Sequence, residues 1–365
     1  MKKLILTNLK DIFKFKIAIS SDCSLRCKHC FIDKTQNLLL SFSEIKKSLD
    51  FFLKLPPSKK KLEIYGGEPF LHFKELKYAI LYAKKRANEL SKKLSIDIAT
   101  NATIISDEIV RFLKKEDIRI SISIFGTAES HNGVRVFPDG IPSYDRVMGN
   151  SLLLLKLLGN LRITAIICVY PQRVKHLFDD FFILYRKGFK IFNLECVSGV
   201  KWSDNNFKEL KDNIDRIKKF IFKNIKNESF FVMFESFIPL IDKTYEDRVC
   251  PFYRDLELRP DGNFSFYPYT FIKNPKDIKK ISIGNIKNGF KERFSNCSYS
   301  PISNQCIGCI DGYYILDGYE DGNVAYRIRN EELSNIMKEV IIKSNKYKKY
   351  FDYLKKIIYV IKKHY

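Results

Sequence analysis

The sequence lacks any run of the roughly 18 apolar residues that a membrane-spanning helix needs. Its opening stretch, MKKLILTNLKDIFKFK, carries too many charges for a secretory signal peptide. It also has no GxGxxG fingerprint, no sequence repeat and no low-complexity linker. We therefore expect a cytoplasmic protein with no membrane partner and a fold other than the open dinucleotide-binding type.

A disulfide framework is a second feature that the composition argues against. The chain has nine cysteines, an odd number, and its 365 residues with 45% hydrophobic content can bury a core without disulfide staples. In a reducing compartment, cysteines act as metal ligands or pack in the core. These are the two roles open to each cysteine of this chain.

Long unbroken basic runs are also missing, although the net charge is +22, from 64 basic and 42 acidic residues. An excess of this size can indicate a negatively charged partner, such as an acidic peptide or RNA. Scattered lysines are more typical of solvated helix faces. The charge alone therefore does not favour a nucleic-acid partner.

What is present is a regular alternation of short β-type runs and longer helical patterns. This alternation predicts parallel βα units, and about six of them predict an α/β fold with a partial (β/α)6 barrel of the TIM type. In such barrels the ligand site lies at the carboxyl ends of the strands. We expect strands at 16–20, 61–65, 96–99, 119–124, 162–169, 190–194 and 230–234, with helices from 41 and 106, near 76–81, and at 144–158, 174–187 and 204–227.

The chain divides into three expected parts. Residues 1–240 form the barrel core, and residues 241–330 form a smaller α+β extension with a hairpin that turns at Asp261 and Gly262. Residues 331–365 form a C-terminal helix. Its apolar residues recur at spacings of three and four, which predicts a face that docks on the body of the protein: Tyr347, Phe351, Leu354, Ile358 and Ile361.

Three cysteines crowd into the stretch CSLRCKHC, directly after the first expected strand: Cys23, Cys27 and Cys30. Chance placement of nine cysteines gives this spacing in under roughly 1% of such chains. Thiolates on one tight loop can converge on an iron–sulfur cluster. A structural zinc wants four ligands, and His29 is poorly placed to be the fourth. Three ligands leave one metal position open, which suits catalysis.

This loop resembles the cluster loop of the radical S-adenosylmethionine (SAM) enzymes. The resemblance covers about residues 14–240 and implies that Cys23, Cys27 and Cys30 hold a [4Fe-4S] cluster whose open iron binds the amino and carboxylate groups of SAM. It also places His29 beside the adenine, where the family usually has an aromatic residue.

Other segments resemble the motifs that follow in this family. YGGEP resembles the GGEP motif, in which Gly66 and Gly67 would let the backbone approach a ligand and Glu68 would accept hydrogen bonds from the SAM ammonium. ISISIFG resembles the SxDG segment and implies that Ser123 binds the ribose or carboxylate, although Phe125 replaces the usual aspartate. Arg135 is the expected partner of the SAM carboxylate, and a surface arginine is the alternative.

A second set of cysteines lies in the extension. CPFYRDLELRPDG and ISIGNI resemble segments of the SPASM and twitch extensions, which bind auxiliary iron–sulfur clusters. Tyr269 stands where a ligand cysteine is usual, and the cysteines that usually follow CIGC are absent, so two auxiliary clusters are not expected. We expect one auxiliary [4Fe-4S] cluster, with a structural zinc at the same thiolates as the alternative: Cys250, Cys297, Cys306 and Cys309.

The last two cysteines follow later strands. Cys168 lies within the apolar run AIICV and is expected in the core. Cys196 lies just past KIFNL, at the expected barrel mouth, where a catalytic thiol could donate a hydrogen atom to a substrate radical.

The resemblance implies reductive cleavage of SAM to a 5'-deoxyadenosyl radical that abstracts hydrogen from a substrate. We predict a maturase of ribosomally made peptides that forms a carbon–carbon or thioether crosslink, with an external one-electron reductant such as flavodoxin or ferredoxin. An acidic leader peptide would suit the basic surface. The alternatives are a peptide epimerase that uses Cys196, an RNA-modifying radical SAM enzyme, and a non-catalytic iron–sulfur carrier or sensor, which has no need of GGEP.

Overall fold

The structure is a computed structural model that describes residues 12–30, 32, 34–227, 229–241, 255–265, 282–290 and 320–363. The four cysteines predicted to bind an auxiliary cluster lie outside the described residues: Cys250, Cys297, Cys306 and Cys309. The predicted division at residues 240 and 330 therefore stays a prediction. No helix among the described residues is long and apolar enough to cross a membrane.

One sheet runs through the described part of the chain, and its first seven strands lie side by side in chain order, all parallel. They are β1 (Lys14–Ala18), β2 (Lys59–Tyr65), β3 (Lys93–Thr100), β4 (Arg119–Ser123), β5 (Ile163–Val169), β6 (Ile191–Cys196) and β7 (Met233–Phe234). This confirms the predicted partial barrel of parallel βα units. The extension contributes β8 (Asp255–Leu258), which pairs in parallel with β1, followed by the antiparallel strands β9 (Asn263–Ser265), β10 (Gly284–Asn285) and β11 (Gly289–Phe290).

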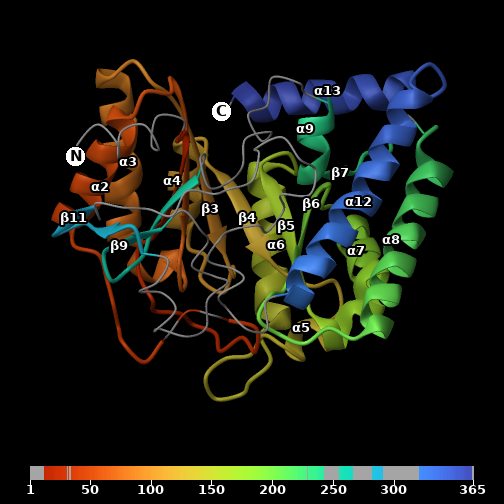
Figure 1. The fold of residues 1–365 in the computed structure, drawn as a ribbon, viewed down its shortest axis with the longest axis horizontal. Helices are drawn as coiled ribbons and strands as arrows, with labels where there is room; N and C mark the ends of the chain where they lie inside the picture. The colour runs from red at the N-terminus through yellow and green to blue at the C-terminus, as the bar shows by residue number, and fades with distance from the viewer. Residues whose placement is uncertain are drawn as a thin grey trace.

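Helices connect the strands and form the outer layer. Figure 1 shows α2 and α3 at one side of the molecule and α7 and α8 at the other, with the strands between them. The helices are α2 (Phe42–Lys54), α3 (Phe73–Glu89), α4 (Asp107–Lys115), α5 (Ala128–Asn132), α6 (Tyr144–Leu158), α7 (Leu177–Arg186), α8 (Asp204–Asn224) and α9 (Ile238–Ile241), with short 3-10 turns η1 (Pro69–His72), η2 (Pro171–His176) and η3 (Glu235–Phe237). Ser41 caps α2 through a capping box with Glu44, and Ser106 caps α4, which confirms the two helix starts expected at these residues.

The two faces of the sheet differ in chemistry because successive side chains of a strand point to opposite faces. Leu62 and Ile64 of β2 are fully buried in the core that the outer helices share. The residue between them, Glu63, lies on the other face and pairs there with Lys61 at 2.8 Å. Lys61 also contacts Asp97 of β3 at 3.0 Å. The inner face of the barrel therefore carries a ladder of ion pairs instead of an apolar core.

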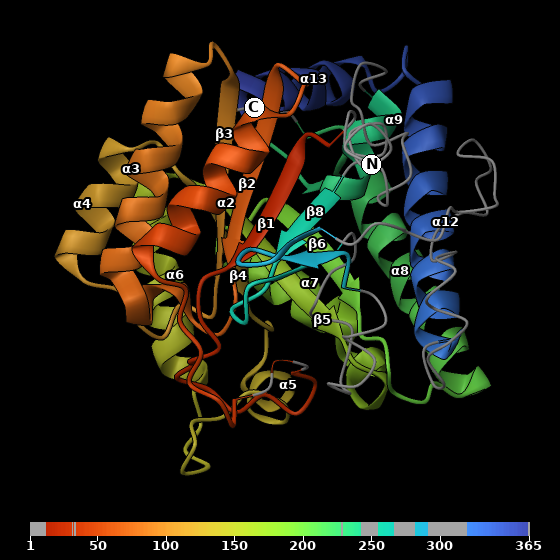
Figure 2. The ribbon, with the colours of Figure 1, turned by 60° about the vertical axis from the view of Figure 1, so that its left-hand side comes forward.

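The C-terminal segment differs from the single helix predicted for residues 331–365. It forms two helices, α12 (Glu320–Ile342) and α13 (Lys348–Lys363), and α12 starts eleven residues before the predicted boundary. A turn at 343–347 separates them, and its sequence, KSNKY, includes serine and asparagine, which are poor helix formers. Figure 2 shows the two helices meeting at an angle, with α12 beside α8.

The predicted docking of this segment is confirmed. Leu354 is fully buried, Ile358 is 3% exposed and Tyr347 is 9% exposed. Tyr350 adds a contact that the pattern did not predict, because its hydroxyl donates a hydrogen bond to the carbonyl of Val232 at 2.7 Å. The apolar stripe of α13 therefore covers the end of the barrel near β7.

Candidate active site

The cysteine loop follows β1, at the carboxyl end of the sheet, and runs beside the segment after α5. The amide of Arg26 donates to the carbonyl of Val136 at 2.8 Å, and the amide of Lys28 donates to Val134 at 2.9 Å. The two hydrogen bonds form a short antiparallel pairing, so the residue between Arg26 and Lys28 lies directly opposite the residue between Val134 and Val136. Cys27 thus lies opposite Arg135.

Arg135 is buried, at 5% exposure, and its guanidinium contacts two thiols. Its Nη1 lies 3.6 Å from the Sγ of Cys27, and its Nη2 lies 3.2 Å from the Sγ of Cys168. Burial lowers the pKa of Arg135, but the neighbouring thiols raise it more, so that the net shift is upward and the side chain is charged. The surface-arginine alternative is therefore wrong, whereas contact with the SAM carboxylate stays a prediction.

The prediction that Cys168 is a core residue holds only in part, because Cys168 is partly buried and packs against the edge of the core. Along β5 the buried residues Ala165, Ile167 and Val169 alternate with partly exposed ones, and Cys168 belongs to the second set. An apolar run in a parallel strand does not reveal which face each residue takes. Cys168 faces the inner side of the barrel, where Arg135 reaches it.

Cys196 takes the opposite face. It pairs in register with Val169, whereas its neighbour Glu195 pairs with Cys168. Cys196 is 1% exposed, packs in the apolar core, and burial raises the pKa of its thiol to about 12. The predicted place at the mouth holds for the backbone, but the thiol is directed away from Cys168 and Arg135.

Gly66 and Gly67 allow a close approach of the GGE segment to the backbone of the cysteine loop, and their predicted approach to a ligand stays a prediction. The amide of Gly67 donates to the carbonyl of Ser20 at 2.9 Å, and the amide of Glu68 donates to Asp22 at 2.7 Å. A Cβ on Gly67 would lie 1.7 Å from the carbonyl oxygen of Asp22, and Gly66 has φ +135°, which disfavours any side chain. The two glycines therefore fix the position of the loop that bears Cys23.

Replacing Gly67 by alanine should push the GGE segment and the cysteine loop apart. We expect the unfolding free energy to fall by at least about 3 kcal/mol, from the steric overlap and the loss of two hydrogen bonds. Urea unfolding under anaerobic conditions measures it. Gly149→Ala is the matched control, because a Cβ there meets nothing within 4 Å. Equal stability of the two variants would contradict this role for Gly67.

Glu68 is fully buried, and its carboxylate joins three elements. Oε1 accepts hydrogen bonds from the amide of Phe70 at 3.1 Å and the hydroxyl of Thr100 at 2.7 Å, and Oε2 accepts from the amide of Asn101 at 2.7 Å. Burial raises the pKa of Glu68 to about 7, although these donors lower it. The carboxylate therefore links the segment after β2 to the end of β3 through hydrogen bonds. Its predicted contact with the SAM ammonium stays a prediction.

A pH series tests that contact. A carboxyl group with a pKa of about 7 is ionised above pH 7 and protonated below it. If Glu68 accepts the ammonium, the affinity for SAM should fall by up to about tenfold per pH unit as the pH drops from 7 to 5.5. Equilibrium dialysis of SAM against the anaerobic protein measures this, and Glu68→Gln should remove the pH dependence. The same slope in both proteins would assign the dependence to another group.

Asn101 is a site residue whose role the motifs did not reveal. Its Nδ2 lies 3.5 Å from the Sγ of Cys23 and 3.1 Å from the Oγ of Ser24, and its Oδ1 accepts from the amide of Thr103 at 2.9 Å. The position at the end of β3 was the only signal in the sequence. Asn101 links the cysteine loop to the third strand and orients Cys23.

His29 is buried within the loop, and its ring lies 6.2 Å from that of Tyr170. Burial, with Arg135 second, holds the pKa of His29 well below its usual range, so that the ring is neutral at pH 7. A neutral flat ring fits the predicted role beside the adenine, which stays a prediction.

The segment after β4 departs from the family pattern in its surroundings as well as in its sequence. Phe125 is 2% exposed and packs edge-on against His131, so that the position of the usual aspartate is part of the core. Ser123, the last residue of β4, is only partly buried, and its predicted contact with SAM stays a prediction.

The residues of the loop fit an iron–sulfur cluster by their chemistry. The thiols of Cys23, Cys27 and Cys30 are partly buried at one end of the sheet, with an amide and a guanidinium donor beside the first two. Among the described residues no three cysteine, histidine or acidic side chains are already gathered as a metal site. Burial raises the pKa of Cys23 to about 11, so cluster binding must displace its proton and draw the thiolates together.

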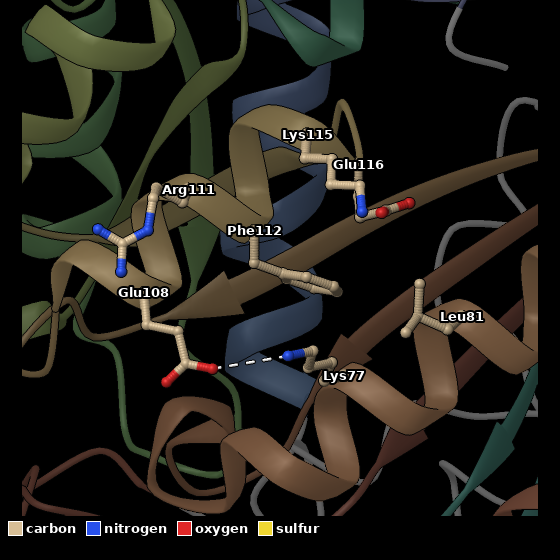
Figure 3. Close-up of a pocket in the computed structure, with 7 residues that line it drawn as sticks. All are labelled: Lys77, Leu81, Glu108, Arg111, Phe112, Lys115 and Glu116. Atoms are coloured by element: carbon tan, nitrogen blue, oxygen red, sulfur yellow. Dashed lines mark ion pairs between the residues drawn. The ribbon is translucent and has the colours of Figure 1, made fainter.

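A surface pocket of about 210 Å³ lies elsewhere, between α3 and α4. Figure 3 shows it lined by charged side chains together with Leu81 and Phe112, with Lys77 and Glu108 paired at 3.6 Å. None of its lining residues comes from a strand end or the cysteine loop. It is therefore no part of the candidate active site.

A parallel barrel-type sheet with a three-cysteine loop at its carboxyl end is the architecture of an iron–sulfur barrel enzyme. Residues 17–181 match the family model of the radical SAM superfamily, the family that the cysteine loop and the GGEP segment resemble. Its cofactors are accordingly a [4Fe-4S] cluster and SAM.

Two relatives show how far the similarity extends. The chain is 24% identical over 342 residues to the cysteine-type anaerobic sulfatase-maturating enzyme of Clostridium novyi, which covers 88% of this chain and 79% of that enzyme. It is 30% identical over 127 residues to an uncharacterised protein of Methanocaldococcus jannaschii. That second match covers 35% of this chain and spans less than half of the relative, 43%.

Solved structures share the fold. A structure of anSMEcpe with bound AdoMet (SAM) aligns with a TM-score of 0.71 at 16% identity, over 90% of this chain and 98% of that one. Streptococcus suis SuiB bound to the precursor peptide SuiA aligns with a TM-score of 0.56 at 16% identity, over 73% of this chain and 62% of that one. At these identities the likeness establishes the radical SAM barrel with its extension, and no more.

Proposed function

We propose that the protein modifies a peptide and that its product is a carbon–carbon or thioether crosslink. When bound, the cluster and SAM supply a 5'-deoxyadenosyl radical that takes a hydrogen atom from the substrate, once an external donor such as flavodoxin or ferredoxin has given one electron. The protein supplies binding, orientation and electrostatics.

The arrangement of Cys27 and Arg135 is the observation that supports the proposal most. Their backbones lie opposite each other, and the guanidinium lies 3.6 Å from the Cys27 sulfur. Asn101 contacts Cys23 from the next but one strand. An iron–sulfur cluster bound to these thiolates would have the guanidinium of Arg135 on one side and the polar inner face of the barrel on the other.

A peptide is the substrate class that the relatives support. SuiB was solved with a precursor peptide, and anSMEcpe with AdoMet and a peptide. The Clostridium novyi relative is named as a sulfatase-maturating enzyme. These are properties of those proteins, and for this chain a peptide substrate is the proposal. The net charge of +22 would suit an acidic leader in such a peptide.

Co-expression with a candidate precursor peptide, followed by mass spectrometry, tests the product. Loss of two hydrogens, with fragments that stay joined across the linked residues, is the expected result. A peptide mass that is unchanged in ordinary water, but that shows deuterium taken up when the solvent is D2O, would mean epimerisation and would contradict the crosslink.

If the protein were an epimerase, the positions of Cys168 and Cys196 would make Cys168 the hydrogen donor instead of Cys196. A thiol that donates hydrogen must reach the substrate, and Cys168 lies on the inner face whereas Cys196 is buried on the other. If solvent deuterium enters the peptide, Cys168→Ala should abolish the uptake and Cys196→Ala should leave more than about half of it. Loss of uptake only in the Cys196 variant would restore the role predicted from the sequence.

The auxiliary cluster remains part of the proposal. Its candidate ligands belong to the extension, whose described strands β8 to β11 continue the sheet beyond β1. A cluster there would accept the electron that a crosslinking reaction releases. The ligands that we propose are those named from the sequence: Cys250, Cys297, Cys306 and Cys309.

A further inference from the structure

Helix α12 brings a buried cation to the carboxyl end of the sheet. The helix packs against α8 and β6, and its first turn is held at the loop after β6. A Cβ on Gly322 would lie 2.5 Å from the Oγ of Ser198, so only glycine allows this contact. The amide of Trp202 donates to the carboxylate of Asp321 at 2.9 Å. The register of α12 against β6 is therefore fixed.

Arg329 lies two helical turns beyond Gly322, on the same side of α12. It is 4% exposed, and its Nε and Nη2 are buried without a hydrogen-bond partner. Its guanidinium carbon lies over the ring of Tyr326, 4.0 Å from the centroid, and the side chain also interacts with the hydroxyl of Tyr326 and with the charge of Glu195. A buried guanidinium with two unsatisfied nitrogens is costly unless something satisfies them.

The surroundings of Arg329 connect it to the active site. Burial lowers the pKa of Arg329, but Tyr326, Glu195 and Cys196 raise it more, so that the side chain is charged. Glu195 is the register partner of Cys168, whose thiol contacts Arg135. The row Arg135, Cys168, Glu195 and Arg329 thus runs across the ends of β5 and β6, starting beside the cysteine loop.

We propose that Arg329 binds a carboxylate of the substrate, an aspartate or glutamate side chain of the peptide. A guanidinium is planar and donates two parallel hydrogen bonds, which match a carboxylate. The two unpartnered nitrogens supply the donors, and Tyr326 holds the plane of the guanidinium. The inference rests on the proposed peptide substrate, and it adds the chemical group that the end of β6 selects.

A binding experiment with the loaded enzyme tests this without turnover. The probes are an acetylated, amidated alanine pentapeptide with one central glutamate, and its glutamine counterpart. Trp202, the single tryptophan of the chain, is 3% exposed beside the first turn of α12 and serves as the fluorescent reporter. We expect the glutamate peptide to bind about tenfold more tightly than the glutamine peptide. Arg329→Gln should remove the difference.

Two variants separate substrate binding from a structural role. Arg327→Gln is the matched control, because Arg327 lies on the same helix and is exposed, and it should keep the tenfold preference. Glu195→Gln should keep or strengthen the preference, since it removes a competing negative charge. The inference is overturned if the wild type binds the two peptides equally or binds neither, or if Arg327→Gln loses the preference too.

The inference would also be overturned if Arg329 served only to form an internal ion pair with Glu195. In that case Arg329→Gln and Glu195→Gln would lower the unfolding midpoint equally, and the double variant would recover it. Failure of the proposed function is distinguishable, because it would appear as a co-expressed precursor peptide that does not lose two hydrogens, whatever the fluorescence titration shows.

Discussion

Replacing Cys27 by alanine should reduce the iron content from about eight to about four per chain and lower SAM cleavage to the background rate. Cys27 is the thiol that lies opposite Arg135, and a cluster held by two thiolates instead of three loses its place at the barrel mouth. The remaining iron would belong to the auxiliary cluster. Iron analysis and the low-temperature EPR spectrum of the reduced protein measure both effects.

Lys28→Ala is the control for the cysteine variant. Lys28 is exposed, lies in the same loop, and contributes its amide, not its side chain, to the pairing with Val134. Its iron content and SAM cleavage should equal those of the wild type. Full iron content in the Cys27 variant would contradict the ligand assignment, and complete loss of iron would contradict an independent auxiliary cluster.

Replacing Arg135 by methionine should lower the reduction potential of the cluster by about 60 to 120 mV, which corresponds to about 1.4 to 2.8 kcal/mol. Reduction adds negative charge at the cluster, and a buried cation 3.6 Å from the Cys27 sulfur stabilises the reduced form. Arg135→Lys should keep most of the potential. Redox titration followed by EPR measures it.

Arg146 provides the comparison for Arg135. It is exposed, and its guanidinium lies over the ring of Phe137, so Arg146→Met should leave the potential unchanged. An unchanged potential in Arg135→Met, together with weaker binding of SAM, would mean that Arg135 acts on the SAM carboxylate, as the motif predicted, and not through the cluster.

The sequence predicted the fold because each local signal agreed with the global one. Apolar runs separated by helical patterns predict parallel strands, and Ser41, Glu44 and Ser106 marked helix starts that the structure confirms. The position of CSLRCKHC after the first strand, and of GGEP after the second, brought the two segments to one edge of the sheet.

The sequence did not predict to which face of the sheet individual side chains point. In a strand that is buried on both sides, polarity does not distinguish the two faces, so the sequence did not show that the thiols of Cys168 and Cys196 take opposite faces. Only the register of β5 and β6 shows that Cys168 lies beside Glu195. The sequence also did not reveal that the glycines of GGEP lie against the backbone of Ser20 and Asp22 in the cysteine loop.

Long-range contacts were equally hidden. Arg329 is 194 residues from Arg135 in the chain, and nothing in the pattern of α12 distinguishes it from exposed basic residues such as Arg327. It becomes notable only once the helix is placed against β6 and the guanidinium is seen to be buried.

Cleavage of SAM in the absence of any peptide is the most direct test of the central claim. The reconstituted protein would be reduced with dithionite under anaerobic conditions and incubated with SAM, and the products separated by liquid chromatography and mass spectrometry. We predict 5'-deoxyadenosine and methionine in equal amounts from the wild type, and neither from the variant that lacks Cys23, Cys27 and Cys30. A wild-type cluster that is fully loaded and reduced, yet yields no 5'-deoxyadenosine, would contradict the account.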